Sequence, residues 1–159
     1  MSIETHKTHL RHAISLSKEG MENGSGGPFG AVIVKEGKVV GKGSNSVTST
    51  NDPTAHAEVV AIRDACKNLG SFQLEGCIIY SSCEPCPMCL GAIYWARPDK
   101  LIYACTAEDA ASVGFDDSFI YKEISLPKEE RSLPSEQMLG DEALDIMKLW
   151  NTKEGKIDY

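Results

Sequence analysis

The sequence predicts an α/β fold in three layers, in which helices cover both faces of a mixed β-sheet of about five strands. Segments typical of strands and of helices follow one another in the order β-β-α-β-α-β, which predicts a mixed sheet with helices on both faces. The 159 residues suffice for one ordinary domain with its own core. No repeat or linker divides them, so we expect a single domain over residues 1–159.

The first part of the chain contains a helix and a hairpin. Apolar residues at helical spacing predict an amphipathic helix over about residues 4–21, which ends at Gly20 and the glycine-rich residues 23–27. An apolar run then indicates a buried strand. The predicted hairpin consists of a strand over 29–35, a turn at Glu36-Gly37 and a partner strand over 38–43. A polar loop over 44–52 follows it.

The middle of the chain alternates helices and strands. A strong helical pattern runs over about 55–69 and is stopped by Gly70. A second helix is expected over 86–96, because Pro87 is tolerated in a first turn and Pro98 lies beyond the end. Short apolar strands precede and follow this second helix, at residues 77–81 and 100–105.

The pattern weakens after Thr106. Residues 114–117 are expected to form a loop, and residues 119–124 either a strand or a short helix. A polar stretch with two prolines follows, and then a helix over about 141–150. Because this weak pattern indicates a loosely attached tail, we expect residues 125–159 to pack on a partner subunit.

Composition limits the classes of function. The net charge of −7 and the pI near 5.1 disfavour a nucleic-acid partner, since binding a polyanion usually requires a surplus of Lys and Arg, and a small neutral substrate fits better. No apolar run is long enough to span a membrane, and residues 1–11 do not resemble a secretory signal, so we expect a cytoplasmic protein.

Cysteine usage points to a metal. Three of the six cysteines, Cys83, Cys86 and Cys89, crowd into one short stretch, which is typical of metal binding and not of disulfides. The other three, Cys66, Cys77 and Cys105, are interpreted as buried small apolar residues.

Two short sequence motifs contain the candidate metal-binding and catalytic residues. His56-Ala-Glu58 opens one helix and Pro85-Cys-Pro-Met-Cys89 opens another, which together give the H-x-E…P-C-x-x-C signature of zinc deaminases. His56, Cys86 and Cys89 would hold Zn²⁺ and leave a fourth position for a water molecule, as catalytic zinc sites do. Glu58 would stand beside that water without binding the metal and move protons as the catalytic residue.

Two other interpretations of these residues fit the sequence less well. A redox dithiol would not need the His-x-Glu motif, and a structural zinc site would need a fourth Cys or His. His6, His9 and His12 are candidates for such a ligand, but their helical spacing favours a solvated helix face. Cys83 lies one turn too early to bind the metal.

The sequence resembles the cytidine deaminase-like superfamily, and more closely the bacterial guanine deaminases, over nearly its whole length. Four stretches carry the resemblance: Gly26-Gly-Pro-Phe-Gly-Ala-Val-Ile-Val34, Asn51-Asp-Pro-Thr-Ala-His-Ala-Glu58, Ser82-Cys-Glu-Pro-Cys-Pro-Met-Cys-Leu-Gly-Ala-Ile93 and Gly114-Phe-Asp-Asp-Ser-Phe-Ile120. The last of these, with the terminal Tyr159, is similar to guanine deaminases specifically, although plant guanosine deaminases share a similar Gly-Phe-Asp-Asp motif.

The resemblance implies a function and a pocket. It implies hydrolysis of guanine to xanthine and ammonia with one zinc ion per subunit, in a homodimer that exchanges its C-terminal segment. Phe29 would then pack on the purine ring, Asn45 would hydrogen-bond its edge, and Asp117 would accept a hydrogen bond from a purine N–H. Tyr159 would cover the pocket. The alternatives are a guanosine, a tRNA adenosine or a cytosine deaminase, and a metal-stabilised scaffold without activity.

Overall fold

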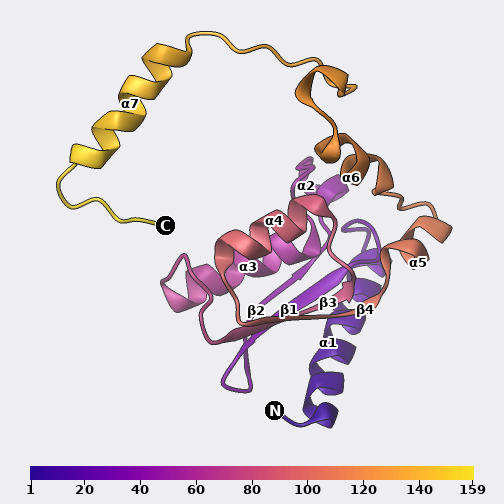
Figure 1. The fold of residues 1–159 in the computed structure, drawn as a ribbon. Coiled ribbons are helices and arrows are strands. Elements are labelled where there is room, and N and C mark those ends of the chain that lie inside the picture. The colour runs from indigo at the N-terminus through magenta and orange to yellow at the C-terminus, as the bar shows by residue number, and fades with distance from the viewer. The chain divides into compact units, whose positions relative to one another are not determined.

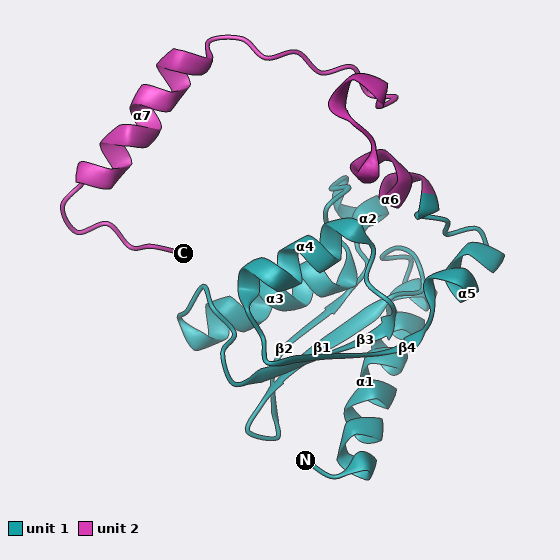
Figure 2. Ribbon diagram, viewed as in Figure 1, with its two compact units in different colours: residues 1–118 teal, residues 119–159 magenta.

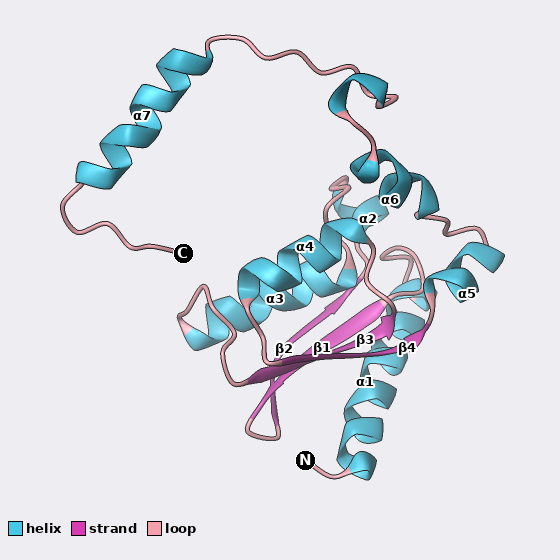
Figure 3. Cartoon of the chain, in the orientation of Figure 1, coloured by secondary structure: helices cyan, strands magenta, loops and turns pink.

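The computed structural model describes residues 1–159, which divide into two compact units of residues 1–118 and 119–159 (Figure 2). The first unit contains a mixed β-sheet with helices on both faces, which confirms the predicted fold class (Figures 1 and 3). The sheet has four strands, not about five, because the chain after the fourth strand forms helices only.

The strands lie in the order β2-β1-β3-β4. They are β1 (Gly30–Lys35), β2 (Lys38–Ser44), β3 (Cys77–Cys83) and β4 (Lys100–Cys105). β1 is antiparallel to both of its neighbours, whereas β3 and β4 are parallel. Because of these strand directions, the start of β1 and the C-terminal ends of β2, β3 and β4 lie at the same end of the sheet. Phe29, which precedes β1, and Asn45 and Cys86, which follow β2 and β3, therefore all lie near that end.

Helices form the outer layers of the first unit. Helix α1 (Ile3–Glu22) covers one face of the sheet, and α3 (Ala57–Leu69) and α4 (Pro87–Ala96) lie side by side over the other (Figure 1). The strands alternate between the two layers, as a period of two requires. Val32, Val34 and Tyr80 pack with the α1 residue Ala13, whereas Ala31, Ile33, Cys77 and Ile79 pack with α3 and α4.

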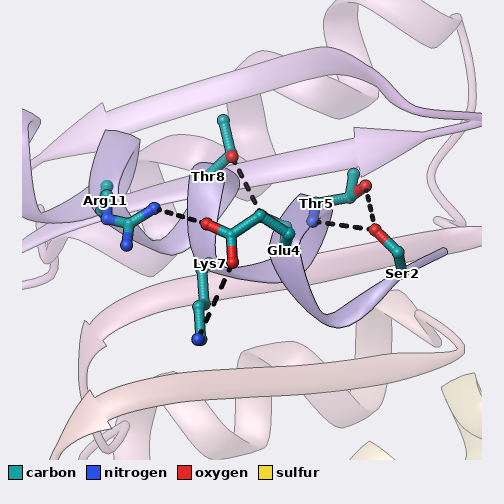
Figure 4. A network of polar contacts seen from close by, with 6 residues as sticks. All are labelled: Ser2, Glu4, Thr5, Lys7, Thr8 and Arg11. Carbon is teal, nitrogen blue, oxygen red and sulfur yellow. Dashed lines mark hydrogen bonds and ion pairs between the residues drawn. The ribbon is translucent and has the colours of Figure 1, made fainter.

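The N-terminus of α1 has local polar stabilisation (Figure 4). Ser2 occupies the N-cap position, and its hydroxyl accepts a hydrogen bond from the Thr5 N–H at 3.2 Å. Glu4 pairs with Arg11 at 3.2 Å and with Lys7 at 3.8 Å. These pairs are exposed, so the cap contributes more to stability than they do.

Helix α3 lies unusually close to strand β2. Its fully buried face consists of the small residues Ala57, Ala61 and Ala65, spaced one turn apart. A Cβ atom added to Gly43 would lie 2.5 Å from the Ala57 carbonyl oxygen, and one added to Gly41 would lie 2.6 Å from that of Ala61. Glycine in β2 thus allows the close approach that sets the position of the α3 N-terminus.

Replacing Gly43 by alanine is expected to lower the free energy of unfolding by about 1–3 kcal/mol, because the added methyl group meets helix backbone that cannot yield. Gly91 in α4 is the matched control, since a Cβ there meets no atom within 4 Å. Gly91→Ala should raise the free energy of unfolding by about 0.5–1 kcal/mol. Urea unfolding measures both, and a Gly43→Ala protein as stable as the wild type would contradict this packing.

The structure contains four helical segments beyond the helices that the sequence predicts outright. Short helix α2 (Val47–Thr50) lies in the predicted loop, and α5 (Ala107–Ser112) follows β4. A capping box stabilises the start of α5: Thr106 accepts from the Asp109 N–H while the Asp109 carboxylate accepts from the Thr106 N–H. Residues 119–124 belong to helix α6 (Ser118–Ser125), the helical one of the two predicted alternatives, and a 3₁₀ turn spans Lys128–Glu130.

The second unit is held by few internal bonds. Arg131 donates to the carbonyls of Leu126 and Ile124, and the Ser132 N–H donates to Glu123. Helix α7 (Gly140–Thr152) confirms the predicted C-terminal helix but buries none of its residues. Its apolar residues Leu144, Ile146, Met147, Leu149 and Trp150 are all exposed. None of the helices is both long and apolar enough to cross a bilayer. Exchange of residues 125–159 between subunits stays a prediction.

Candidate metal centre and active site

The N-termini of helices α3 and α4 carry the predicted metal ligands at this end of the sheet. His56 is the N-cap residue of α3 and Cys86 is the N-cap residue of α4, both with extended backbone. Pro87 takes the first helical position of α4, where its missing N–H costs nothing. Cys89 follows one turn later, so the two sulfur atoms lie on the same side of the helix start.

The structure brings His56, Cys86 and Cys89 together. Nδ1 of His56 lies 3.5 Å from Sγ of Cys86 and 3.5 Å from Sγ of Cys89, and all three ligand atoms lie within 4.8 Å of one another. Zinc bonds of about 2.3 Å to sulfur and about 2.0–2.1 Å to nitrogen, at a tetrahedral angle, require N···S separations of about 3.6 Å. The three side chains thus fit a zinc ion with one open coordination position.

The electrostatics of the site favour a thiolate. Hydrogen bonds from Cys89 and then from His56 lower the pKa of Cys86 to about 4, while the same bond to Cys86 raises the pKa of Cys89. The hydrogen bond to Cys86 also raises the pKa of His56. The positive end of the α4 dipole acts in the same direction on Cys86. Such a cluster is ready to exchange protons for a divalent cation.

Glu58 lies beside the ligands but is not one of them. It occupies the first turn of α3 and is 5% exposed. Burial raises its pKa, although Oε1 accepts a hydrogen bond of 2.9 Å from the Ser81 hydroxyl. A carboxyl group with a raised pKa is suited to release a proton as well as to take one up.

Phe29 and Asn45 lie at the same end of the sheet as the metal ligands, just before β1 and just after β2. The half-buried Phe29 packs against the core cluster and meets Phe115 edge to face, with ring centroids 4.9 Å apart. Asn45 is buried, and its Oδ1 accepts hydrogen bonds from the backbone N–H groups of Gly27 and Val47. Phe29 thus takes part in core packing, Asn45 holds two loops together, and the predicted contacts of both with a substrate stay predictions.

Asp117 lies in the first unit and Tyr159 in the second. Burial, and next the charge on Cys86, raise the pKa of Asp117, which places this carboxylate within electrostatic range of the metal ligands. Asp116 is exposed and accepts from the Ser118 N–H. Tyr159 is an exposed residue at the end of the second unit, and its predicted role stays a prediction.

The remaining cysteines and histidines differ in part from expectation. Cys83 is buried and its thiol donates to the Thr106 carbonyl, in agreement with a residue that does not bind the metal. Cys77 is buried, but Cys66 is half-buried and Cys105 is exposed because β4 lies at the sheet edge. His6 and His9 are not simply solvated, since both contact the buried Tyr80.

Three polar or aromatic residues at the site had no role in the sequence-based interpretation. Ser81 donates to Glu58, Phe115 contacts Phe29, and Glu84 accepts from the Ala107 N–H at the start of α5. Phe115 lies within the Gly114–Ile120 stretch that drew attention to Asp117. A hydroxyl at the end of an otherwise apolar strand is the signal that could have identified Ser81.

The comparisons with known proteins agree with this geometry. Residues 3–105 match the family model of the cytidine and deoxycytidylate deaminase zinc-binding region. Guanine deaminase of Bacillus subtilis (strain 168) is 58% identical over 154 residues, which cover 97% of this chain and 99% of that protein.

Solved structures and more distant relatives extend the comparison. The X-ray structure of guanine deaminase from Bacillus subtilis superimposes with a TM-score of 0.94 at 57% identity, covering 100% of this chain and 99% of that one. The tRNA-specific adenosine deaminase of Aquifex aeolicus is 45% identical over only 95 residues, 60% of this chain and 62% of that protein. The chain belongs to the family of zinc-binding deaminases that includes the cytidine, deoxycytidylate and guanine deaminases.

Proposed function

We propose that this protein hydrolyses guanine to xanthine and ammonia, with zinc held by His56, Cys86 and Cys89 and with Glu58 as the catalytic residue. The observation that carries the proposal is the spacing of the three ligand atoms next to a buried carboxyl group. The similarity to a guanine deaminase over 97% of the chain supports this choice of substrate.

Glu58 performs the proton transfers of the reaction. Zinc bound by these ligands supplies the Lewis acidity that makes water nucleophilic near neutral pH. The Glu58 carboxylate takes a proton from the water that adds to C2 of the purine and delivers it to a ring nitrogen. It then moves the second water proton to the departing amine, so that the C2–N bond breaks and ammonia leaves.

The pocket residues match the edges of guanine. Oδ1 of Asn45 already accepts two backbone hydrogen bonds, so the side chain would offer its amide N–H to an acceptor on the purine. Asp117 would accept from the N1–H of guanine, a donor that adenine lacks. The Phe29 ring, fixed edge to face by Phe115, would pack on the bicyclic base.

We further propose that the chain acts as one deaminase domain in a homodimer, with residues 125–159 exchanged and Tyr159 covering the partner's pocket. Helix α7 supports this proposal, because it leaves five large apolar side chains exposed in the single chain. Apolar faces of this size on an isolated helix usually pack against another surface. Sedimentation analysis tests the dimer: a monomer at micromolar concentration would contradict it.

A substrate panel tests the proposed function. Zinc-loaded protein should convert guanine to xanthine with release of ammonia, and should be much slower on guanosine, adenine and cytosine and on adenosine in tRNA. The acidic net charge of −7 disfavours the tRNA substrate. If fully metallated protein is inactive on guanine, the proposal fails, and preference for guanosine or tRNA would assign the site to that substrate instead.

Replacing Asp117 by asparagine is expected to lower kcat/KM for guanine by about 10- to 100-fold, because the N1–H of the base then meets a neutral acceptor in place of a charged one. Asp116→Asn is the matched control: this neighbour is exposed, its carboxylate accepts hydrogen bonds from the backbone and the side chain of Ser118, and an asparagine oxygen can still accept the bond from the Ser118 N–H. Steady-state kinetics on guanine compare the two. Equal values for both variants would remove Asp117 from the pocket.

A further inference from the structure

Ser81 forms a hydrogen bond with Glu58, the proposed catalytic residue. Its hydroxyl donates to Oε1 of Glu58 at 2.9 Å, between two side chains that are 1% and 5% exposed. Hydrogen bonds to a charged group inside a protein are stronger than those at its surface, since water does not compete for the partners. This contact therefore affects how the Glu58 carboxyl group is oriented.

The position of Ser81 follows from strand alternation. Cys77 and Ile79 of β3 pack with α3 and α4, so Ser81, two residues further on, points to the same layer and meets the start of α3. Ser82 points the other way, and its hydroxyl accepts from the Gly30 N–H at 3.0 Å. Two adjacent buried serines thus serve different partners, and only Ser81 contacts Glu58.

The hydrogen bond from Ser81 joins strand β3 to the first turn of helix α3, where Glu58 lies. It therefore fixes the carboxyl group relative to the sheet, from an element that carries none of the proposed metal ligands.

We propose that Ser81 is a positioning residue for Glu58, which holds Oε1 in place so that Oε2 is the oxygen that takes and releases the proton. The proposal rests on the proposed function of Glu58. A carboxyl group held by one oxygen presents the other in a constant direction, whereas a free one must be oriented again at each proton transfer. Because Ser81 is fully buried and acts through Glu58, its loss should lower kcat and leave KM nearly unchanged.

The test compares one matched pair of variants and one neighbouring control in zinc-loaded protein. Ser81→Thr and Ser81→Val have side chains of nearly equal shape, but only the threonine keeps the hydroxyl. Ser81→Val is expected to lose about tenfold in kcat on guanine, KM and zinc content staying within twofold, while Ser81→Thr keeps most of the rate. Ser82→Ala removes the neighbouring buried hydroxyl and should lower the unfolding midpoint but not kcat at a temperature where it is folded.

A second readout does not depend on activity. Urea unfolding of Ser81→Ala, Glu58→Ala and the double variant should show midpoint changes that do not add, because each single change already breaks the shared hydrogen bond. Additive changes would overturn the proposal, as would equal kcat for Ser81→Val and Ser81→Thr. If the wild type turns over no base while the changes are non-additive, the proposed function fails and the contact between Ser81 and Glu58 stands.

Discussion

Replacing Glu58 by glutamine is expected to lower the rate of guanine deamination by about 10²- to 10⁴-fold, while the protein retains its zinc. The amide has nearly the shape of the carboxylate and can still accept from Ser81, but it cannot take up and release a proton near neutral pH. Each of the three proton transfers then lacks its carrier. Release of ammonia, measured with the metal content of the same sample, gives both quantities.

Glu108→Gln provides the control for the change in charge. Glu108 is an exposed residue in the first turn of α5, and its replacement should leave the rate within twofold. A Glu58→Gln protein with full zinc and wild-type activity would remove Glu58 from the mechanism. It would also favour the metal-stabilised scaffold as an explanation of the site.

Replacing Cys86 by alanine is expected to remove zinc, activity and part of the stability together. One of three protein ligands is lost, and the two that remain, His56 and Cys89, cannot hold the ion firmly in competition with a chelator. Binding of a metal to the folded state stabilises that state, so the melting temperature should fall as well. We expect less than about a tenth of the wild-type zinc occupancy after dialysis against a mild chelator.

Cys83→Ala is the matched control for this prediction. Cys83 lies in the same short stretch and is buried, but its sulfur contacts the Thr106 carbonyl and not the cluster. This variant should keep its zinc, with only the loss of stability typical of a truncated buried side chain. Full zinc occupancy in Cys86→Ala would disprove the ligand assignment.

Most of the first unit could be predicted from local sequence patterns. The helices of residues 57–69 and 87–96 begin at His56 and Cys86, and Gly70 or a following proline marks where they end. The turn at Glu36-Gly37 has positive φ at both residues, as tight hairpins prefer. The number of strands, four and not about five, was less predictable, because a segment as short as residues 119–124 does not distinguish the period of a strand from that of a helix.

The metal ligands could be predicted because the motif fixes them locally, at the starts of two helices. The contacts of Glu58 with Ser81 and of Phe29 with Phe115 join segments 23 and 86 residues apart, respectively. They depend on strand register and loop packing, which the composition of each segment does not reveal. The helix α5 could have been found, since Thr106 and Asp109 have the spacing of a capping box.

X-ray absorption at the zinc edge of the purified protein tests the central claim most directly. We predict one zinc ion per chain, with two sulfur neighbours at about 2.3 Å and two nitrogen or oxygen neighbours at about 2.0–2.1 Å. The sulfur neighbours are Cys86 and Cys89, and His56 is one of the lighter pair. Protein without bound zinc, or a zinc ion surrounded by four sulfur atoms, would contradict the account.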